Sequence, residues 1–331
     1  MHNGCQVGCQ NVATMVSVSV RPPAPASYQT YDERFLALIE PEAMLHHLAG
    51  GCTWAEGPVY LPTRDELWWS DVRQNRRLCY TPADGSVVVL DQPANFCNGH
   101  TLDLDDRVLA CEHGTRSVVR FEVDGSLTVI ADRFDGKRLN SPNDVVVASD
   151  GAVWFTDPTY GIDSDAEGYP ADSEIGSSNV YRVDPASGSV AAMITDMVRP
   201  NGLAFSLDES SLYVVDTGWT HVTDGPRNIR RYDVCDGAVV GVGELWATCP
   251  VGLFDGLRLD EAGRIWTSGG EGVYCYDPDG TLLGTVVLPE PCANVVFGGA
   301  GRRTLYMTAT TSLYALVLRV SGAGSGTNRF G

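Results

Sequence analysis

Residues 139–157 read LNSPNDVVVASDGAVWFTD, which is an apolar run, a turn, a second apolar run and an acid. Two strands joined by a tight turn explain most of this pattern, because DG pairs favour hairpin turns and Val, Trp and Phe favour strands. The amide Asn143 opens the first of these strands. An amide at the start of a buried strand needs partners for its polar atoms. The stretch therefore predicts a hairpin and leaves open what Asn143 binds.

The second half of this stretch recurs along the chain as a turn, an apolar or aromatic run and a small or acidic residue. The six copies are DELWWSD (65–71), DDRVLACE (105–112), DGAVWFTD (150–157), ESSLYVVD (209–216), AGRIWTSG (262–269) and RRTLYMTA (302–309). No long stretch has a helical period, and the best helix candidate is short, at 32–39. Six similar β-rich units predict an all-β fold, a six-bladed β-propeller of four-stranded blades around a central tunnel.

The ends of the repeat array set the expected boundaries. Residues 44–51 (MLHHLAGG) are predicted to add an outer strand to the last blade and so close the ring. We expect the propeller to span 28–320. Residues 1–27, which end in RPPAPAS, are predicted to be a disordered or loosely held extension, and 321–331 (SGAGSGTNRFG) a flexible tail.

Charge and cysteine content narrow the class of protein. The net charge of −19 argues against nucleic acid and anionic membranes as partners. No apolar run of about 18 residues predicts a membrane span, and the N-terminus lacks the basic region of a secretory signal. Ten scattered cysteines without a CxxC pair predict free thiols in a cytoplasmic protein, although a disulfide between distant cysteines stays open. The oligomeric state is not predicted.

A polar residue stands ten or eleven residues before each aligned apolar run. The six are Glu56, Asn98, Asn143, Asn201, Asp255 and Asn294. Because the first strand of each propeller blade lines the channel, this shared register predicts a ring of oxygen-bearing side chains at one mouth of the tunnel. Asn-Gly and Asp-Gly pairs are also common turn residues, which is the competing interpretation. The register in all six repeats, including Glu56, favours the ring.

Carboxylate and amide oxygens without a Lys or Arg among them are typical ligands of a hard cation. We expect one divalent cation, with Ca²⁺ favoured because it accepts irregular oxygen shells. Mg²⁺ and Mn²⁺ remain open, and Zn²⁺ is less favoured because the set has no Cys or His. A second group of acids follows the aligned runs, at Asp71, Glu112, Asp157 and Asp216. These acids either support the ring, form another cation site or cap turns through backbone amides.

Several longer segments resemble the senescence-marker-protein, gluconolactonase and luciferin-regenerating family, most of all its bacterial gluconolactonase branch. They are EGPVY (56–60), NGHTLDLDDRVLACEHGTRSVVRFE (98–122), LNSPNDVVVASDGAVWFTDPTYG (139–161), RPNGLAFSLDESSLYVVDTG (199–218) and FDGLRLDEAGRIW (254–266). The likeness covers about residues 45–318. It implies a six-bladed propeller with one divalent cation in its tunnel and hydrolysis of a small lactone.

The resemblance also implies roles for single residues. Glu56, Asn143, Asn201 and Asp255 match the family's metal ligands, and Asp255 matches its general base or nucleophile. The implied mechanism is attack of water, activated by Asp255, on a lactone carbonyl polarised by the cation. Animal members carry Arg at the position of Ser141.

Further residues are candidates for contacts with the substrate. They are Asn98, His100, His113, Asn294, Tyr160 and Trp219, the last two on predicted rim loops at 158–178 and 217–228. Two other functions stay open: a non-enzymatic calcium-binding or ligand-binding propeller, and a related hydrolase or biosynthetic enzyme that acts on a substrate other than a sugar lactone.

Overall fold

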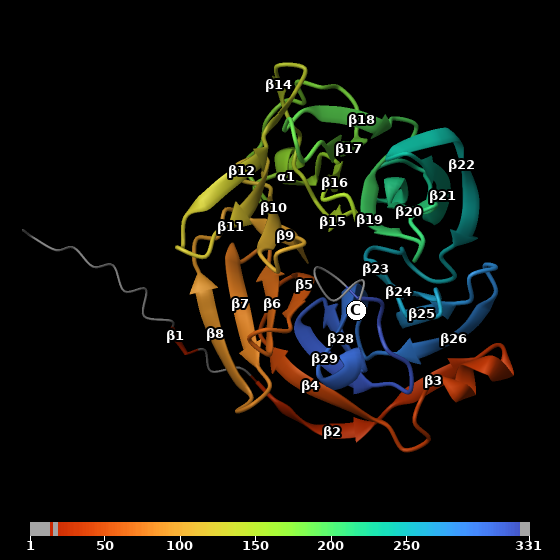
Figure 1. The fold of residues 1–331 in the computed structure, drawn as a ribbon. Coiled ribbons are helices and arrows are strands. Elements are labelled where there is room, and N and C mark those ends of the chain that lie inside the picture. The colour runs from red at the N-terminus through yellow and green to blue at the C-terminus, as the bar shows by residue number, and fades with distance from the viewer. Residues whose placement is uncertain (1–13, 16–18, 325–331) are drawn as a thin grey trace, which may run out of the picture.

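Six antiparallel sheets stand in a ring around a central axis in the computed structural model, which describes residues 14–15 and 19–324 (Figure 1). Each sheet contains four strands of one blade in meander order, with the first strand nearest the axis. The predicted all-β fold, a six-bladed propeller of four-stranded blades, is therefore confirmed.

The blades follow one another along the chain. Blade one consists of β5 (Ala55–Leu61), β6 (Glu66–Asp71), β7 (Arg76–Thr81) and β8 (Ser86–Asp91). Blade two consists of β9 (Cys97–Leu102), β10 (Val108–Glu112), β11 (Ser117–Phe121) and β12 (Leu127–Ala131). Blade three consists of β15 (Val145–Val147), β16 (Val153–Asp157), β17 (Asn179–Val183) and β18 (Val190–Ile194). Blade four consists of β19 (Pro200–Phe205), β20 (Ser211–Asp216), β21 (Asn228–Cys235) and β22 (Ala238–Thr248). Blade five consists of β23 (Leu257–Leu259), β24 (Ile265–Gly269), β25 (Gly272–Tyr276) and β26 (Leu282–Val287).

Blade six joins the two ends of the chain. Its first three strands are β27 (Cys292–Gly298), β28 (Thr304–Ala309) and β29 (Ser312–Val317), and its fourth is β4 (Met44–Gly50). The strand β4 pairs antiparallel with β29, from Ser312 opposite Gly50 to Ala315 opposite His46. The predicted closure of the ring by residues 44–51 is confirmed, and it leaves blade six without an open outer edge at β29.

Residues 21–30 form what we call the N-terminal strap. Its strand β2 (Arg21–Pro25) pairs with β4 of blade six, and its strand β3 (Ser27–Thr30) pairs with β26 of blade five. A short strand β1 (Thr14–Met15) pairs with β8 of blade one. The strand layer thus begins before residue 28, the predicted boundary. Residues 1–13 and 16–18 lie outside the described residues.

Few residues lie in helices. The remaining elements are η1 (Glu33–Ala37), β13 (Arg133–Phe134), β14 (Lys137–Arg138), α1 (Tyr160–Asp163), η2 (Gly218–Thr220) and η3 (Ala300–Arg302). The predicted helix at 32–39 is the 3₁₀ helix η1. Within the described ranges, no helix has the length and apolar character needed to cross a bilayer.

At its C-terminal end the chain returns to the propeller and hydrogen-bonds to two blades. The amide of Gly322 donates to the Arg302 carbonyl oxygen over 2.9 Å, and the amide of Ala323 donates to that of Leu259, also over 2.9 Å. This part of the predicted tail is therefore bonded to blades six and five, near the centre of the view in Figure 1. Residues 325–331 lie outside the described residues.

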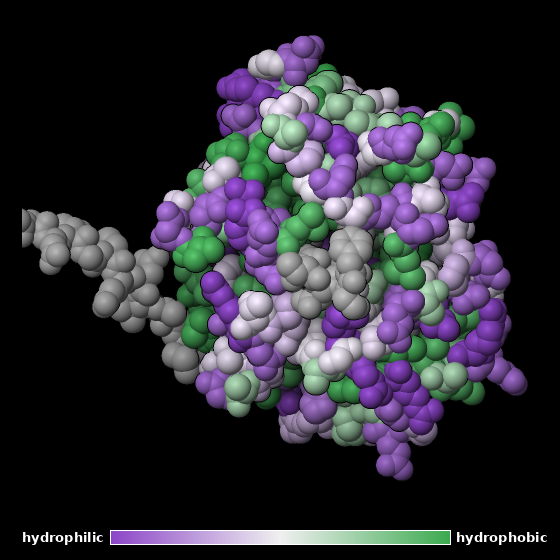
Figure 2. Space-filling model, in the orientation of Figure 1, coloured by the Kyte–Doolittle hydropathy of each residue, from purple (hydrophilic) through white to green (hydrophobic). Residues whose placement is uncertain are grey.

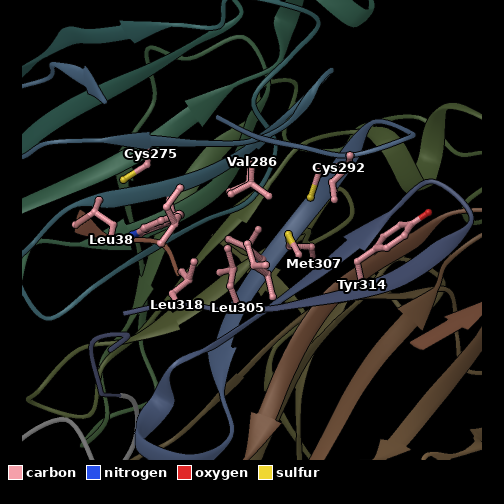
Figure 3. Packing of buried hydrophobic residues seen from close by; sticks show 14 of the residues in the cluster. Leu38, Cys275, Val286, Cys292, Leu305, Met307, Tyr314 and Leu318 are labelled. Carbon is pink, nitrogen blue, oxygen red and sulfur yellow. The ribbon is translucent and has the colours of Figure 1, made fainter. Parts of the chain in front are cut away.

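The apolar core consists of clusters between neighbouring blades. Figure 3 shows the one between blades five and six, where Leu38, Cys275, Val286, Cys292, Leu305, Met307, Tyr314 and Leu318 pack together. Seven described cysteines are buried as free thiols, as predicted: Cys52, Cys79, Cys97, Cys111, Cys249, Cys275 and Cys292. The face in Figure 2 carries mostly hydrophilic residues, with apolar residues in smaller patches between them.

Candidate active site

The innermost strands of four blades begin with a β-bulge. In blade two, Cys97 pairs with Glu112 and His100 pairs with Ala110, so that Asn98 and Gly99 face a single residue. Comparable shifts follow Glu56 in blade one, Pro200 in blade four and Cys292 in blade six. A bulge turns a side chain away from regular alternation. The bulge lies at or directly after the first polar residue of the strand in blades one, two and four, at Glu56, Asn98 and Asn201, whereas in blade six it precedes Asn294.

The glycines that follow these polar residues bring neighbouring blades into contact. The amide of Gly99 donates to the Asn143 carbonyl oxygen over 2.8 Å, and that of Gly202 to the Asp255 carbonyl oxygen over 3.0 Å. A Cβ atom on Gly99 would lie 2.5 Å from the first of these oxygens, and one on Gly202 would lie 2.2 Å from the second. The Asn-Gly pairs are thus places of close backbone approach, and the competing interpretation as turns does not hold here.

The starts of the inner strands surround a cavity of about 480 Å³ at one end of the tunnel. Five of the six predicted ring residues line it: Glu56, Asn98, Asn143, Asn201 and Asp255. Tyr160 and Trp219, two predicted substrate contacts, line its wall. Residues further along the same strands line a separate cavity of about 400 Å³, toward the other end. The structure therefore places the four predicted metal ligands around one space.

Two carboxyl groups lie together on the floor of this cavity. Burial raises the pKa of Glu56 to about 7, although the amides of Gly57 and Asn294 donate to its carboxylate. Burial, and then the charge of Glu56, raise the pKa of Asp255 well above its usual range. The two groups are near enough to hydrogen-bond when one is protonated. Bringing both charges to this floor therefore costs energy that a cation could offset.

A third buried carboxyl group lies below this floor. Burial raises the pKa of Asp144, and the guanidinium of Arg258 opposes that effect, with its Nη1 3.6 Å from Oδ2 of Asp144. That oxygen has no hydrogen-bond partner among the described residues. With all three acids ionised, one guanidinium leaves two negative charges uncompensated at this end of the tunnel.

The acids at the ends of the second strands hold the segments that lead into the ring. Asp157 accepts from the amides of Asn140 and Ser141, each over 2.8 Å, just before Asn143. Asp71 and Asp216 likewise accept backbone amides just before Glu56 and Asn201. Glu112 accepts side-chain donors instead, from Asn95 and Thr115. Of the interpretations left open by the sequence, capping of backbone amides describes three of these four acids.

Three predicted substrate contacts are bonded within the protein. His100 is fully buried, donates from Nδ1 to the Gly57 carbonyl oxygen over 2.6 Å, and lines the other cavity. Burial lowers its pKa to about 3. His113 is bonded to Asn98 and Glu167, and Asn294 to Glu56. None of these three residues is among those that line the cavity at the ring, and their contact with a substrate stays a prediction.

A family model described as the SMP-30/Gluconolactonase/LRE-like region matches residues 54–311. The chain belongs to the SMP-30/gluconolactonase/LRE-like family. The gluconolactonase of Zymomonas mobilis is 28% identical over 327 residues, covering 88% of this chain and 86% of that protein. The pentonolactonase XacC of Haloferax volcanii is 32% identical over 270 residues, covering 78% of this chain and 81% of that protein. A solved gluconolactonase structure, XC5397 of Xanthomonas campestris, is 37% identical with a TM-score of 0.83, covering 91% and 98%.

In this member of the SMP-30/gluconolactonase/LRE-like family, two rim loops are bonded to each other above the ring. The hydroxyl of Tyr160 lies 2.6 Å from Oγ1 of Thr217 and 3.0 Å from Oγ1 of Thr220. Arg199 pairs with Asp163 over 2.7 Å and lies over the Tyr160 ring. These bonds join the predicted rim loops at 158–178 and 217–228 and give the cavity a defined wall.

Ser141, where the family resemblance implies an Arg in animal members, supports the first rim loop. Its Oγ donates to the Pro158 carbonyl oxygen over 2.7 Å and accepts from the Gly161 amide over 2.9 Å. Ser141 is fully buried and does not line the cavity.

The oxygen set fits a hard cation by its chemistry. No described side chain hydrogen-bonds to the amide groups of Asn143 and Asn201, which leaves their oxygens available. The two carboxylates and two amides present hard oxygen donors, which suit Ca²⁺ or Mg²⁺. The described residues contain no group of three His, Cys, Asp or Glu side chains arranged to hold a metal ion. A cation here would therefore depend on the amides and on water as well as on Glu56 and Asp255.

Proposed function

We propose that this protein is a lactonase that requires a divalent cation, most of all Ca²⁺, and hydrolyses a small lactone. Support comes from the relatives, which include a gluconolactonase and a pentonolactonase. It also comes from the cavity at one end of the tunnel, which has room for a sugar-sized ring.

The observation that carries the proposal is the pair of buried carboxyl groups of Glu56 and Asp255. Both have raised pKa values, and neither has a Lys or Arg partner among the described residues. Such a pair is costly unless it binds a proton or a cation. In the proposed site, Glu56, Asn143, Asn201 and Asp255 hold the cation.

The cation would supply polarisation of the lactone carbonyl. Asp255, whose pKa burial raises well above its usual range, takes a proton from the attacking water, which is the role that the family resemblance implies for it. Burial and the charge of Glu56 raise this pKa, whereas a bound positive charge would lower it. The bonded rim loops hold the substrate over the floor and limit access of bulk water.

The test uses the purified full chain and a panel of sugar and unsubstituted lactones. Hydrolysis is followed by acid release with added Ca²⁺ and with a chelator. We expect turnover of at least one lactone that the chelator abolishes and Ca²⁺ restores. Absence of turnover on the whole panel, with Ca²⁺ still bound, would instead indicate a calcium-binding or ligand-binding propeller.

The substitution Asp255→Asn separates binding of the cation from catalysis. It keeps an oxygen donor but removes the base, so we expect kcat to fall by roughly 10²-fold or more. Calorimetric titration with Ca²⁺ checks that the variant still binds the cation. Undiminished turnover in a cation-loaded Asp255→Asn protein would exclude Asp255 as the base.

A further inference from the structure

His113 lies behind the cavity wall with both ring nitrogens in use. Its Nδ1 lies 2.9 Å from the backbone oxygen of Glu167, and because a carbonyl oxygen only accepts, Nδ1 carries the hydrogen. Burial lowers the pKa of His113, which keeps the ring neutral and leaves Nε2 as an acceptor. The tautomer of this histidine is therefore set by the loop that contains Glu167.

This tautomer fixes the orientation of Asn98. The amide nitrogen of Asn98 lies 3.3 Å from Nε2 of His113, so the amide donates one hydrogen to the ring. Nitrogen and oxygen of an amide are otherwise interchangeable in shape. Because the nitrogen is bound to His113, the oxygen Oδ1 is the end that faces the cavity, which Asn98 lines.

The first rim loop rests directly on His113. A Cβ atom added to Gly161 would lie 2.4 Å from Cβ of His113, so α1 packs on the histidine without an intervening side chain. Glu167, whose backbone oxygen binds the ring, pairs through its carboxylate with Arg73 over 2.9 Å. His113 thus connects the rim loop to a residue of the ring.

We propose that His113 is a positioning residue that, through Asn98, makes this site select lactones with a hydroxyl group on the ring. The inference rests on the lactonase function proposed above. Oδ1 of Asn98 accepts the hydrogen of that hydroxyl. A lactone without it leaves a buried acceptor unpaired, which is the kind of loss that gives strong discrimination.

The experiment compares δ-gluconolactone with δ-valerolactone, which has the same ring and no hydroxyl groups. The ratio of their kcat/KM values is measured for the wild type and for His113→Phe, His113→Gln and Asn98→Ala. We expect the wild type to favour the hydroxylated lactone by about 100-fold or more. His113→Phe and Asn98→Ala lose about tenfold or more of this preference, mainly through the hydroxylated substrate.

Two further variants test the connection itself. Gln at position 113 can accept from Asn98 and donate to Glu167, so His113→Gln keeps more of the preference than His113→Phe. The double variant of His113→Phe and Asn98→Ala is no worse than either single variant, because both remove the same interaction. His46, exposed on β4, supplies the matched control, and His46→Phe retains the wild-type ratio.

The other outcomes overturn the inference. An equal loss of kcat/KM for both lactones in His113→Phe and Asn98→Ala would mean that His113 only supports the fold. A tenfold weaker Ca²⁺ affinity of Asn98→Ala, measured by calorimetry, would make Asn98 a ligand of the cation instead. A wild type that opens neither lactone would also overturn the inference, and the proposed function falls only if no lactone of the whole panel is hydrolysed, whereas the first two results leave that function intact.

Discussion

The side-chain amide of Asn294 donates to Oε2 of Glu56 across 3.2 Å, and so connects the inner strand of blade six to that of blade one. The two residues are 238 positions apart in the chain. The hydrogen bond favours the ionised form of Glu56 and limits the rise of its pKa. Closure of the ring and the charge state of the site are therefore linked.

Replacement of this amide, in Asn294→Leu, is expected to weaken binding of the cation. Without the donor the pKa of Glu56 rises further, so less of the residue is ionised at pH 7. We expect a Ca²⁺ affinity about tenfold lower at pH 7, in line with loss of one hydrogen bond to a charged group. Calorimetry at pH 7 and at pH 9 measures it, and the deficit should shrink at pH 9. Equal affinities of wild type and variant at pH 7 would contradict the link.

The stabilisation that the proton on Glu56 gives the cation-free protein is expected to fall as pH rises from 5 to 8. Glu56 has a pKa of about 7 in the folded protein and a lower one when unfolded, so the folded state binds more protons between these values. The stabilisation by this proton is present below the unfolded pKa and is lost as pH passes through about 7. Asp157, with a pKa raised to about 7 by burial, acts in the same direction.

A bound cation should oppose this fall. Thermal unfolding followed by circular dichroism, with chelator and with Ca²⁺, is expected to show a larger Ca²⁺-induced rise of Tm at pH 8 than at pH 5. The Asp157 contribution is the same with chelator and with Ca²⁺, whereas Glu56→Gln should remove most of the difference. A rise of Tm that is the same at both pH values would count against a cation at Glu56.

Gly202→Ala is expected to disturb the ring of polar residues, although it adds only one methyl group. The new Cβ would lie 2.2 Å from the Asp255 carbonyl oxygen, so either blade four or the Asp255 backbone must move. We expect a loss of roughly 1–3 kcal/mol of stability and at least tenfold of Ca²⁺ affinity. Gly85→Ala, at a positive-φ turn with open space around it, is the control. It should cost about 1 kcal/mol of backbone strain and leave Ca²⁺ affinity unchanged.

Removal of the N-terminal strap is expected to lower stability while the site remains. Deletion of residues 1–30 takes β2 from blade six and β3 from blade five, and exposes the outer edges of β4 and β26. We expect Tm to fall by roughly 5 °C or more, with Ca²⁺ affinity nearly unchanged because the cavity lies at the inner strands. Deletion of residues 1–18, which also removes β1 from blade one but keeps the strap, is the comparison, and an equal drop of Tm in both proteins would show that the strap is not responsible.

The repeat pattern was enough to predict the fold and the shared register of the ring. Period-two runs and turn pairs recur six times, and the offset from each polar residue to the next run is nearly constant. Such regularity follows from the geometry of equivalent blades, so it can be read from the sequence. The shared register predicts Glu56 and Asp255, 199 residues apart, at one mouth of the tunnel, and both line the same cavity.

The assumed alternation of side chains between the two faces of a strand does not hold where the strand contains a bulge. Asn98 and His100 are two residues apart and would share a face in a regular strand. The bulge at Asn98 and Gly99 breaks this rule, so Asn98 lines one cavity and His100 the other. A bulge has little signature in a single sequence, although the glycine after the polar residue is a signal that could have indicated one.

The strap was missed for a similar reason. Its first strand reads RPPAP, and proline favours extended loops and the edges of sheets over central strands. Here it forms an outermost edge strand, where missing amide hydrogens do little harm. The composition of this segment indicated a loose extension. Its pairing with β4 depends on the assembled blade six, which local composition does not indicate.

The closure of blade six determines when, during translation, the ring can be completed. The strand β4 leaves the ribosome early, but its partner β29 lies about 265 residues later in the chain. At ordinary translation speeds this interval is on the order of tens of seconds, during which the nascent chain carries β4 without its partner β29 and an open ring. The enclosed site can form only after translation has reached β29, so ribosome-bound fragments that stop short of it should lack the complete pocket and depend on chaperones.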